Sequence, residues 1–202
     1  VAGQIAFMLL VEPWLRARGR ERIAEIERTH GLDESPIAEP VLHVASVNSD
    51  EARAAIRAAR PAVVVVNGTR IIGRATLAAI ECPIINTHAG ITPQYRGVHG
   101  AYWALAEGRP DLVGTTVHFV DPGIDTGAVI AQRTFEPTPA DSFATYPSLH
   151  TAAGLPLLID AVRDALRGEL KAAPPRADLE SRLRHHPTLW GYLYRRLRSA
   201  VR

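Results

Sequence analysis

Asn86 and His88 stand two residues apart, where the apolar run Pro83-Ile84-Ile85 passes directly into polar residues. Side chains two apart in a β-strand face the same way, so both are predicted to project from the carboxyl end of a buried strand. In open α/β sheets, ligands bind at that edge. An amide can hold an oxygen that gains negative charge while a neighbouring imidazole manages a proton. Taken alone, the pair is better interpreted as a strand end that satisfies loop backbone.

A carboxylate is predicted to reach the same edge. Asp125 lies in a glycine-bearing loop, residues 121–127, between strands predicted over 115–120 and 128–135. Its side chain could orient His88 and raise the pKa of the imidazole by stabilising the charged form. Taken alone, Asp followed by Thr-Gly is also ordinary turn chemistry.

The elements that must position these residues alternate along the chain. The run Ala62–Val66 is β-branched and typical of a strand buried on both faces of a parallel sheet. Ser49 is a plausible N-cap for an alanine-rich helix. The other segments are strands at 41–47, 83–88, 115–120 and 128–135, and helices at 4–30 with a break at Pro13, 50–60, 70–79, 99–107 and 141–167. Strands alternating with helices predict an α/β layered fold with a mostly parallel sheet and flanking helices.

Composition excludes several classes of protein. The 202 residues are 47% hydrophobic, enough for one globular domain with a full core that needs no metal or disulfide. The single cysteine, Cys82, excludes an internal disulfide, disfavours a cysteine-built zinc site and suits a reducing cytoplasm. A net charge of only +2 argues against a generic nucleic-acid binder. The apolar stretch at 5–11 is too short to span a bilayer, and no signal peptide is recognisable.

The last residues differ from the rest. We expect a catalytic domain over 1–176 and a basic, aromatic helical tail over 177–202. Packing of the tail's aromatic side on the domain is favoured over contact with an anionic membrane surface or a partner. His185 and His186 are expected to be exposed to solvent, and no metal site is predicted.

Three separated runs now identify a family resemblance. They are Asn-Thr-His-Ala-Gly-Ile-Thr-Pro-Gln-Tyr-Arg-Gly-Val-His at 86–99, Gly-Thr-Thr-Val-His-Phe-Val at 114–120 and Gly-Ile-Asp-Thr-Gly at 123–127. They resemble the formyltransferases that use 10-formyltetrahydrofolate, which pair an Asn-x-His strand end with a Leu/Ile-Asp-x-Gly loop. The resemblance covers Pro61 to Gln132. It implies a Rossmann-like formyltransferase fold and an enzyme of one-carbon metabolism.

The resemblance also implies roles for individual residues. Asn86 and His88 would stabilise the oxyanion formed when an amine attacks the formyl carbon, and Asp125 would orient His88 and assist proton movement. The walls of the folate pocket would be Gly68, Thr69, Arg70, Ile71, Ile72, Val120, Asp121, Gly123 and Ile124. The residues assigned to the acceptor are Gln94, Tyr95, Arg96 and His99.

The implied acceptor is the primary amine of a small, phosphorylated molecule such as a nucleotide-linked amino sugar, because the run at 95–99 is closer to that of the sugar-amine enzymes. The alternatives are glycinamide ribonucleotide transformylase, formyltetrahydrofolate hydrolase and an inactive binding module that uses the tail. Methionyl-tRNA formyltransferase is disfavoured because a helical tail follows instead of a β-rich domain, and no nucleic-acid partner is expected. The oligomeric state stays open.

The beginning of the chain departs from the family. Residues 1–30 do not resemble the strand, glycine-bearing loop and helix with which the family begins. We therefore expect either that this unit lies upstream of Val1 or that the acceptor is held in another way.

Overall fold

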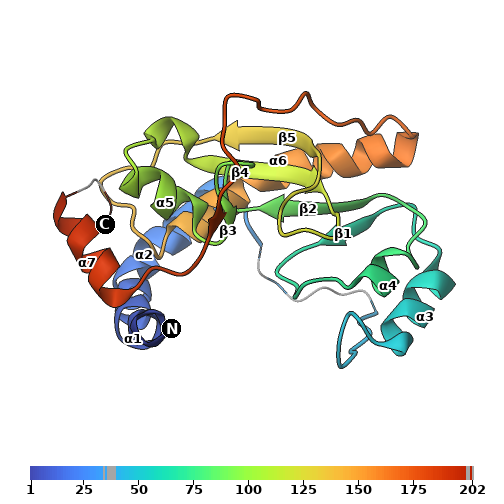
Figure 1. Ribbon diagram of the computed structural model, residues 1–202, viewed down its shortest axis with the longest axis horizontal. Helices are drawn as coiled ribbons and strands as arrows, with labels where there is room; N and C mark the ends of the chain where they lie inside the picture. The colour runs from blue at the N-terminus through green and yellow to red at the C-terminus, as the bar shows by residue number, and fades with distance from the viewer. Residues whose placement is uncertain (34, 36–39, 199–200, 202) are drawn as a thin grey trace.

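The computed structural model describes residues 1–33, 35, 40–198 and 201, and its centre is a four-stranded sheet (Figure 1). The strands lie in the order β1 (Val64–Val66), β2 (Ile84–His88), β4 (Gly114–Phe119) and β5 (Val129–Thr134). The pair β1–β2 is parallel, whereas β2–β4 and β4–β5 are antiparallel. The sheet is therefore mixed, and the prediction of a mostly parallel sheet is wrong.

The direction of β4 explains this error. Parallel neighbours need a crossover that returns the chain to the same end of the sheet. The chain between β2 and β4 contains α5 (Gly100–Ala106) and a short 3₁₀ turn, Pro110–Leu112, but β4 starts at the end of the sheet where β2 stops. The helical segment between β2 and β4 was thus interpreted as a crossover to a parallel strand, but β4 runs antiparallel to β2.

One face of the sheet is covered by the long helix α6 (Tyr146–Arg167), which contacts β2, β4 and β5. Ile85 of β2, Val117 of β4 and Ala161 of α6 are buried together in this layer. On the outer side, α6 packs against α2 (Glu12–His30). The flanking-helix part of the prediction is therefore confirmed for this face.

The N-terminal helical region is longer than predicted. A first turn, α1 (Ala2–Ala6), continues through a π-helical turn at Phe7–Val11 into α2. Pro13 lies in the first turn of α2, directly after the π-helical turn, and the helix continues through it. Gly31 ends α2 in the left-handed conformation, with φ of 62°.

Several other boundaries differ from the predictions. The Ser49 hydroxyl caps α3 (Asp50–Ala59) as predicted, by accepting from the Ala52 amide at 3.1 Å. Residues 41–47 form no strand, and Val41 and Leu42 are exposed, because alternation alone supplies no neighbouring strand to pair with. The helix predicted over 70–79 is only α4 (Arg74–Leu77). Residues 67–73 are therefore irregular backbone.

The tail contains two elements. β6 (Leu183–Arg184) pairs in parallel with β3 (Arg96–Gly97), and α7 (Leu189–Arg198) follows. Tyr192 of α7 is buried, whereas Trp190 and Tyr194 are exposed. Of the three aromatic residues of the tail that were predicted to pack on the domain, one therefore does so. The last part of the predicted tail, residues 199, 200 and 202, lies outside the described residues.

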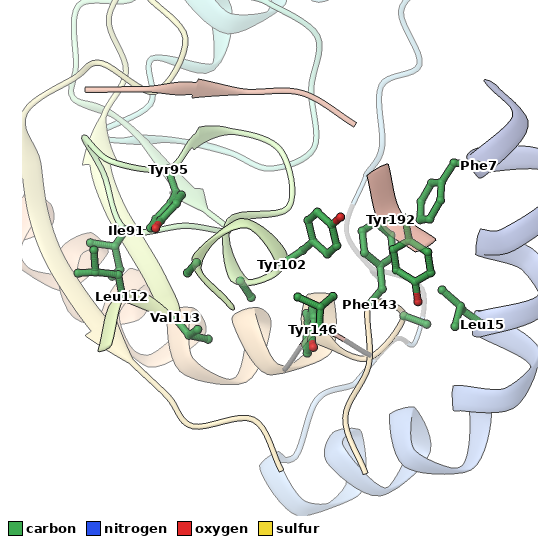
Figure 2. Packing of buried hydrophobic residues seen from close by; sticks show 14 of the residues in the cluster. Phe7, Leu15, Ile91, Tyr95, Tyr102, Leu112, Val113, Phe143, Tyr146 and Tyr192 are labelled. Atoms are coloured by element: carbon green, nitrogen blue, oxygen red, sulfur yellow. The ribbon is translucent and has the colours of Figure 1, made fainter. Parts of the chain in front are cut away.

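The largest core joins the two ends of the chain. Figure 2 shows Phe7, Tyr102, Phe143 and Tyr192 side by side, from the N-terminal region, α5, the loop before α6 and α7. The Phe7 ring centroid is 5.0 Å from that of Phe143 and 4.9 Å from that of Tyr192. Within the part of the chain that the structure describes, no helix has the length and apolar character needed to cross a membrane.

A buried carboxylate ties α2 to the loop that precedes α6. Asp141 is 3% exposed and accepts hydrogen bonds from Arg22 Nε at 2.9 Å and from the Thr138 amide at 2.7 Å. Burial by itself would raise the pKa of Asp141, but the bonds from Arg22 and Thr138 hold it below its usual range. The charged form is therefore the one that stabilises the fold.

We expect Asp141→Asn to lower the free energy of unfolding by about 1 to 3 kcal/mol, because hydrogen bonds to a charged group are lost. A depressed folded-state pKa means that this stabilisation is complete above about pH 5 and is lost as the pH falls through the folded-state value. Urea unfolding at several pH values should show the difference shrinking towards acid. Asp160→Asn removes an exposed ion pair with Arg163 and is the control, with an effect below about 1 kcal/mol. Equal losses in the two variants would contradict the assignment.

Candidate active site

The polar residues at the end of β2 lie beside β4 and the loop that follows it. In the antiparallel pairing, Asn86 stands opposite His118 and His88 stands opposite Thr116. The loop after β4 turns back and carries Asp125 to the same place. Asn86, His88, His118 and Asp125 all line one cavity with a volume of about 630 Å³.

Both ring nitrogens of His88 have partners. Nε2 lies 2.6 Å from the Tyr95 carbonyl oxygen, and Nδ1 lies 3.3 Å from Asp125 Oδ2. Because a carbonyl can only accept, Nε2 carries a proton and donates it. The close packing here requires Gly90, where a Cβ would lie 2.4 Å from the Tyr95 carbonyl oxygen and 2.8 Å from His88 Nε2. His88 is thereby held in one orientation.

Burial sets the pKa of His88. The side chain is 5% exposed, and removal from water lowers its pKa below the usual range. The Asp125 carboxylate and the Tyr95 carbonyl raise the pKa, whereas His118 lowers it slightly. The predicted sign of the Asp125 effect is therefore right, but the predicted net rise is wrong because desolvation outweighs it. His88 is neutral at neutral pH.

Asp125 is anchored by backbone. The Gly97 amide donates to Oδ2 at 2.8 Å, and Asp125 itself adopts a left-handed conformation with φ of 51°. Gly97 has φ of 92°, and a Cβ there would lie 2.2 Å from the Arg184 carbonyl oxygen. Burial alone would raise the pKa of Asp125, but its contacts with His118 and His88 and the hydrogen bond from the Gly97 amide hold it below the usual range. The side chain is a carboxylate at neutral pH.

His118 was not among the predicted site residues. Its Nδ1 donates to the Phe119 carbonyl at 2.7 Å, and Asn86 Nδ2 donates to its Nε2 at 3.2 Å. His118 Nε2 also lies 3.6 Å from Asp125 Oδ1. The second amide N–H of Asn86 has no partner among the residues that the structure describes. The signal that could have found His118 is its position opposite Asn86, which requires β4 to be recognised as the antiparallel neighbour of β2.

All nine residues predicted to form the folate pocket line this cavity, in two loops. The first, residues 67–73, is fixed by Asn48, which donates to the Ile71 carbonyl at 2.9 Å and accepts from the Gly73 amide at 2.7 Å. In the second, Asp121 Oδ1 accepts from the Gly123 amide at 2.9 Å and from the Thr126 hydroxyl at 2.6 Å. The loops are therefore shaped by hydrogen bonds within the protein, from Asn48 to the first and from Asp121 within the second.

Of the four residues predicted to bind the acceptor, only His99 lines the cavity. Gln94 Oε1 accepts from the Glu180 amide at 3.0 Å, and Arg96 donates to the Ile124 carbonyl at 3.0 Å. Tyr95 is fully buried and donates to Glu107 at 3.3 Å, and burial with that contact raises its pKa to about 12. These three side chains contact other parts of the protein and do not line the cavity.

The tail supplies a wall that the sequence did not predict. Residues 183–186 line the cavity, and His186, expected to be exposed, is half-buried. Its Nδ1 lies 2.9 Å from His99 Nε2. Burial, with a smaller contribution from His186, lowers the pKa of His99 to about 4. No cluster of three or more histidine, cysteine, aspartate or glutamate side chains within the described ranges is placed to hold a metal ion.

The chain is similar to proteins of one known family. A family model described as formyl transferase matches residues 17–162. A methionyl-tRNA formyltransferase of Anaeromyxobacter dehalogenans is 35% identical over 140 residues, which are 69% of this chain and 44% of that protein. The chain spans about two fifths to a half of the length of the methionyl-tRNA formyltransferases that it matches.

Two solved structures show the fold. A sugar N-formyltransferase from a Shewanella species has a TM-score of 0.56 at 21% identity, covering 68% of this chain and 54% of that one. The formyltransferase PseJ from Anoxybacillus kamchatkensis, solved with UDP-4,6-dideoxy-4-formamido-L-AltNAc and tetrahydrofolate, has a TM-score of 0.52 at 17% identity. This second match covers 81% of this chain and 80% of that one.

We expect Asp125→Asn to lower the pKa of His88 further, because the carboxylate is the main group that raises it against burial. The measurement is the pH dependence of the imidazole ¹⁵N chemical shifts. Asp121→Asn is the control, since that carboxylate binds Gly123 and Thr126 instead. An unchanged or higher pKa of His88 in Asp125→Asn would show that the two side chains do not interact.

Proposed function

The chain belongs to the formyl transferase family, and we propose on that premise that it transfers a formyl group from 10-formyltetrahydrofolate to the primary amine of a nucleotide-linked amino sugar. The observation that carries the proposal is the group of Asn86, His88 and Asp125 around one cavity. It combines an amide donor, a neutral imidazole and a carboxylate on the lining of one cavity, with the imidazole Nδ1 3.3 Å from the carboxylate. These are the groups needed to stabilise an oxyanion and to move one proton.

The two loops of the cavity fit a folate. A pterin is a flat heterocycle with amide-like donors and acceptors, which suits irregular backbone between apolar side chains. Residues 68–72 and 120–124 supply both, with Ile71, Ile72, Val120 and Ile124 as the apolar side chains. The folate would supply the formyl carbon that is transferred.

Asn86 is proposed to stabilise charge on the formyl oxygen. Its amide gives one N–H to His118 and keeps the other for the cavity. His118 therefore fixes the direction of the amide without competing for the second N–H. A donor held in place before the reaction stabilises developing negative charge without reorganising in the transition state.

His88 and Asp125 are proposed to handle the proton. The unprotonated Nδ1 and the carboxylate Oδ2 are two acceptors that face each other at 3.3 Å. As the amine nitrogen bonds to the formyl carbon it loses a proton, and a proton placed between these two atoms satisfies both. That proton then goes to the departing folate nitrogen as its bond to the formyl carbon breaks. The products are the formamide and tetrahydrofolate.

An amino sugar is favoured as the acceptor because the cavity carries few cations. Arg70 and Arg184 are the arginines among its lining residues, and Arg184 is paired with Glu107 at 2.7 Å. Binding along a nucleic-acid backbone needs several cations. The second candidate is methionyl-tRNA, which the name of the 35% identical Anaeromyxobacter relative favours.

The test begins with calorimetric titration of the protein with 10-formyl-5,8-dideazafolate. Formylation is then assayed with a panel of dTDP- and UDP-linked 3-amino and 4-amino sugars and with methionyl-tRNA. The product is detected by its mass. Folate binding with formylation of an amino sugar is expected. Formylation of methionyl-tRNA alone would select the second candidate, and absence of folate binding by the folded protein would overturn the proposal.

Substitutions in the site should separate chemistry from binding. Asn86→Ala is expected to lower kcat by about 10²- to 10³-fold, because one oxyanion donor is lost. His88→Ala and Asp125→Ala are expected to abolish turnover, and all three should bind the folate analogue with a Kd within a few fold of wild type. His43→Ala, on exposed chain outside the cavity, is the control. Parallel loss of binding and rate would contradict this division of roles.

A further inference from the structure

The segment between α6 and α7 forms a wall of the candidate site. Figure 1 shows the chain returning from the end of α6 past β5 and β4 to β3, where β6 lies, before it enters α7. On this path the Ala173 amide donates to the Val129 carbonyl at 2.7 Å. Residues 183–186 then line the cavity. They lie outside residues 17–162, so the family match assigns them no role.

Hydrogen bonds from separate elements hold this wall in place. The amides of Arg96 and Val98 donate to the carbonyls of residues 182 and 184, at 3.1 Å and 3.2 Å. The Trp103 indole donates to the His185 carbonyl at 3.1 Å, and the Gln4 side chain donates to the His186 carbonyl at 2.9 Å. The backbone of the wall is therefore positioned before a ligand binds.

His186 and His99 form a hydrogen-bonded pair in this wall, with 2.9 Å between His186 Nδ1 and His99 Nε2. The His99 ring also packs on Phe143, with ring centroids 4.5 Å apart. The pair lies next to the reaction centre, because the amide of Gly100, the residue after His99, donates to the carbonyl of Ala89, the residue after His88.

The chemistry of this pair suits a hydroxyl group. His99 is neutral at neutral pH because its pKa is about 4. One proton lies between the two rings, so Nε2 of His186 is a donor or an acceptor according to which ring holds that proton. A hydroxyl both donates and accepts and can match either state, whereas a phosphate group needs cations.

We propose that His186, oriented by His99, binds a hydroxyl of the acceptor's sugar ring and makes the enzyme specific for hydroxylated amino sugars. This proposal rests on the proposed function. His186 is a specificity-determining residue, and the tail thereby selects the acceptor of a reaction that β2, β4 and their loops carry out.

The test uses His186→Ala and His186→Gln in the full chain. With the amino sugar that the panel identifies and saturating 10-formyltetrahydrofolate, we expect His186→Ala to raise the KM for that sugar about 3- to 10-fold, because one hydrogen bond to a neutral group is lost. The kcat and the Kd for 10-formyl-5,8-dideazafolate should stay within about twofold, since in our assignment His186 contacts neither the folate nor the reacting atoms. His186→Gln keeps a donor and an acceptor and should recover most of the loss.

A substrate comparison makes the test specific. Analogues of the amino sugar that lack one ring hydroxyl are assayed with wild type and with His186→Ala, beside the control His43→Ala. With wild type, one deoxy analogue should have a higher KM than the parent sugar. With His186→Ala, the same analogue and the parent sugar should have similar KM values, because the variant and the analogue each remove the same hydrogen bond.

An unchanged KM in His186→Ala, fully additive losses for every analogue, or parallel changes in kcat, KM and folate Kd would overturn the proposal. Wild type that binds no folate or formylates no amine would instead show that the proposed function has failed. Wild type that formylates only methionyl-tRNA would overturn the choice of an amino sugar.

Discussion

The Asp125 carboxylate lies among groups from three parts of the fold. His88 comes from the end of β2, His118 from β4, and the Gly97 amide from β3. These groups converge because β4 runs antiparallel to β2, which puts the loop after β4 beside the polar end of β2. The left-handed backbone at Gly97 and Asp125 completes the arrangement. The mixed direction of the sheet is thus a condition for the site.

Burial and charge act on the site in opposite directions, and their balance suits proton transfer. Desolvation keeps His88 neutral, while the pKa of Asp125 stays below its usual range, so that Asp125 remains a carboxylate. A base must be unprotonated before it accepts a proton, and a nearby carboxylate then stabilises the charged form. If the effect of Asp125 on the pKa of His88 outweighed that of burial, His88 would already be protonated at neutral pH. If burial acted without Asp125, the accepted proton would be poorly stabilised.

The local sequence pattern was sufficient to predict some residues of the site, but not the direction of β4 or the position of His118. The positions of Asn86 and His88 followed from alternation within one strand, whereas the assignment of residues 68–72 and 120–124 to a folate pocket came from the family resemblance. The direction of β4 and the place of His118 depend on pairing between distant segments, which periodicity does not encode. Gln94, Tyr95 and Arg96 lie within the same run as His99, but nearness in sequence does not determine which way a loop side chain points. All three are occupied by Glu180, Glu107 and Ile124.

The two ends of the chain reach the cavity through the largest core. Phe7 packs on Phe143, which packs on His99, and Gln4 holds the carbonyl of His186. Tyr192 of α7 belongs to the same cluster and packs on Phe7. A change in the N-terminal helix would therefore displace His99 and His186 before it displaced Asn86, His88 and Asp125, which belong to the sheet and its loops. Acceptor recognition and formyl chemistry thus depend on different parts of one fold, so the first can vary while the second is retained.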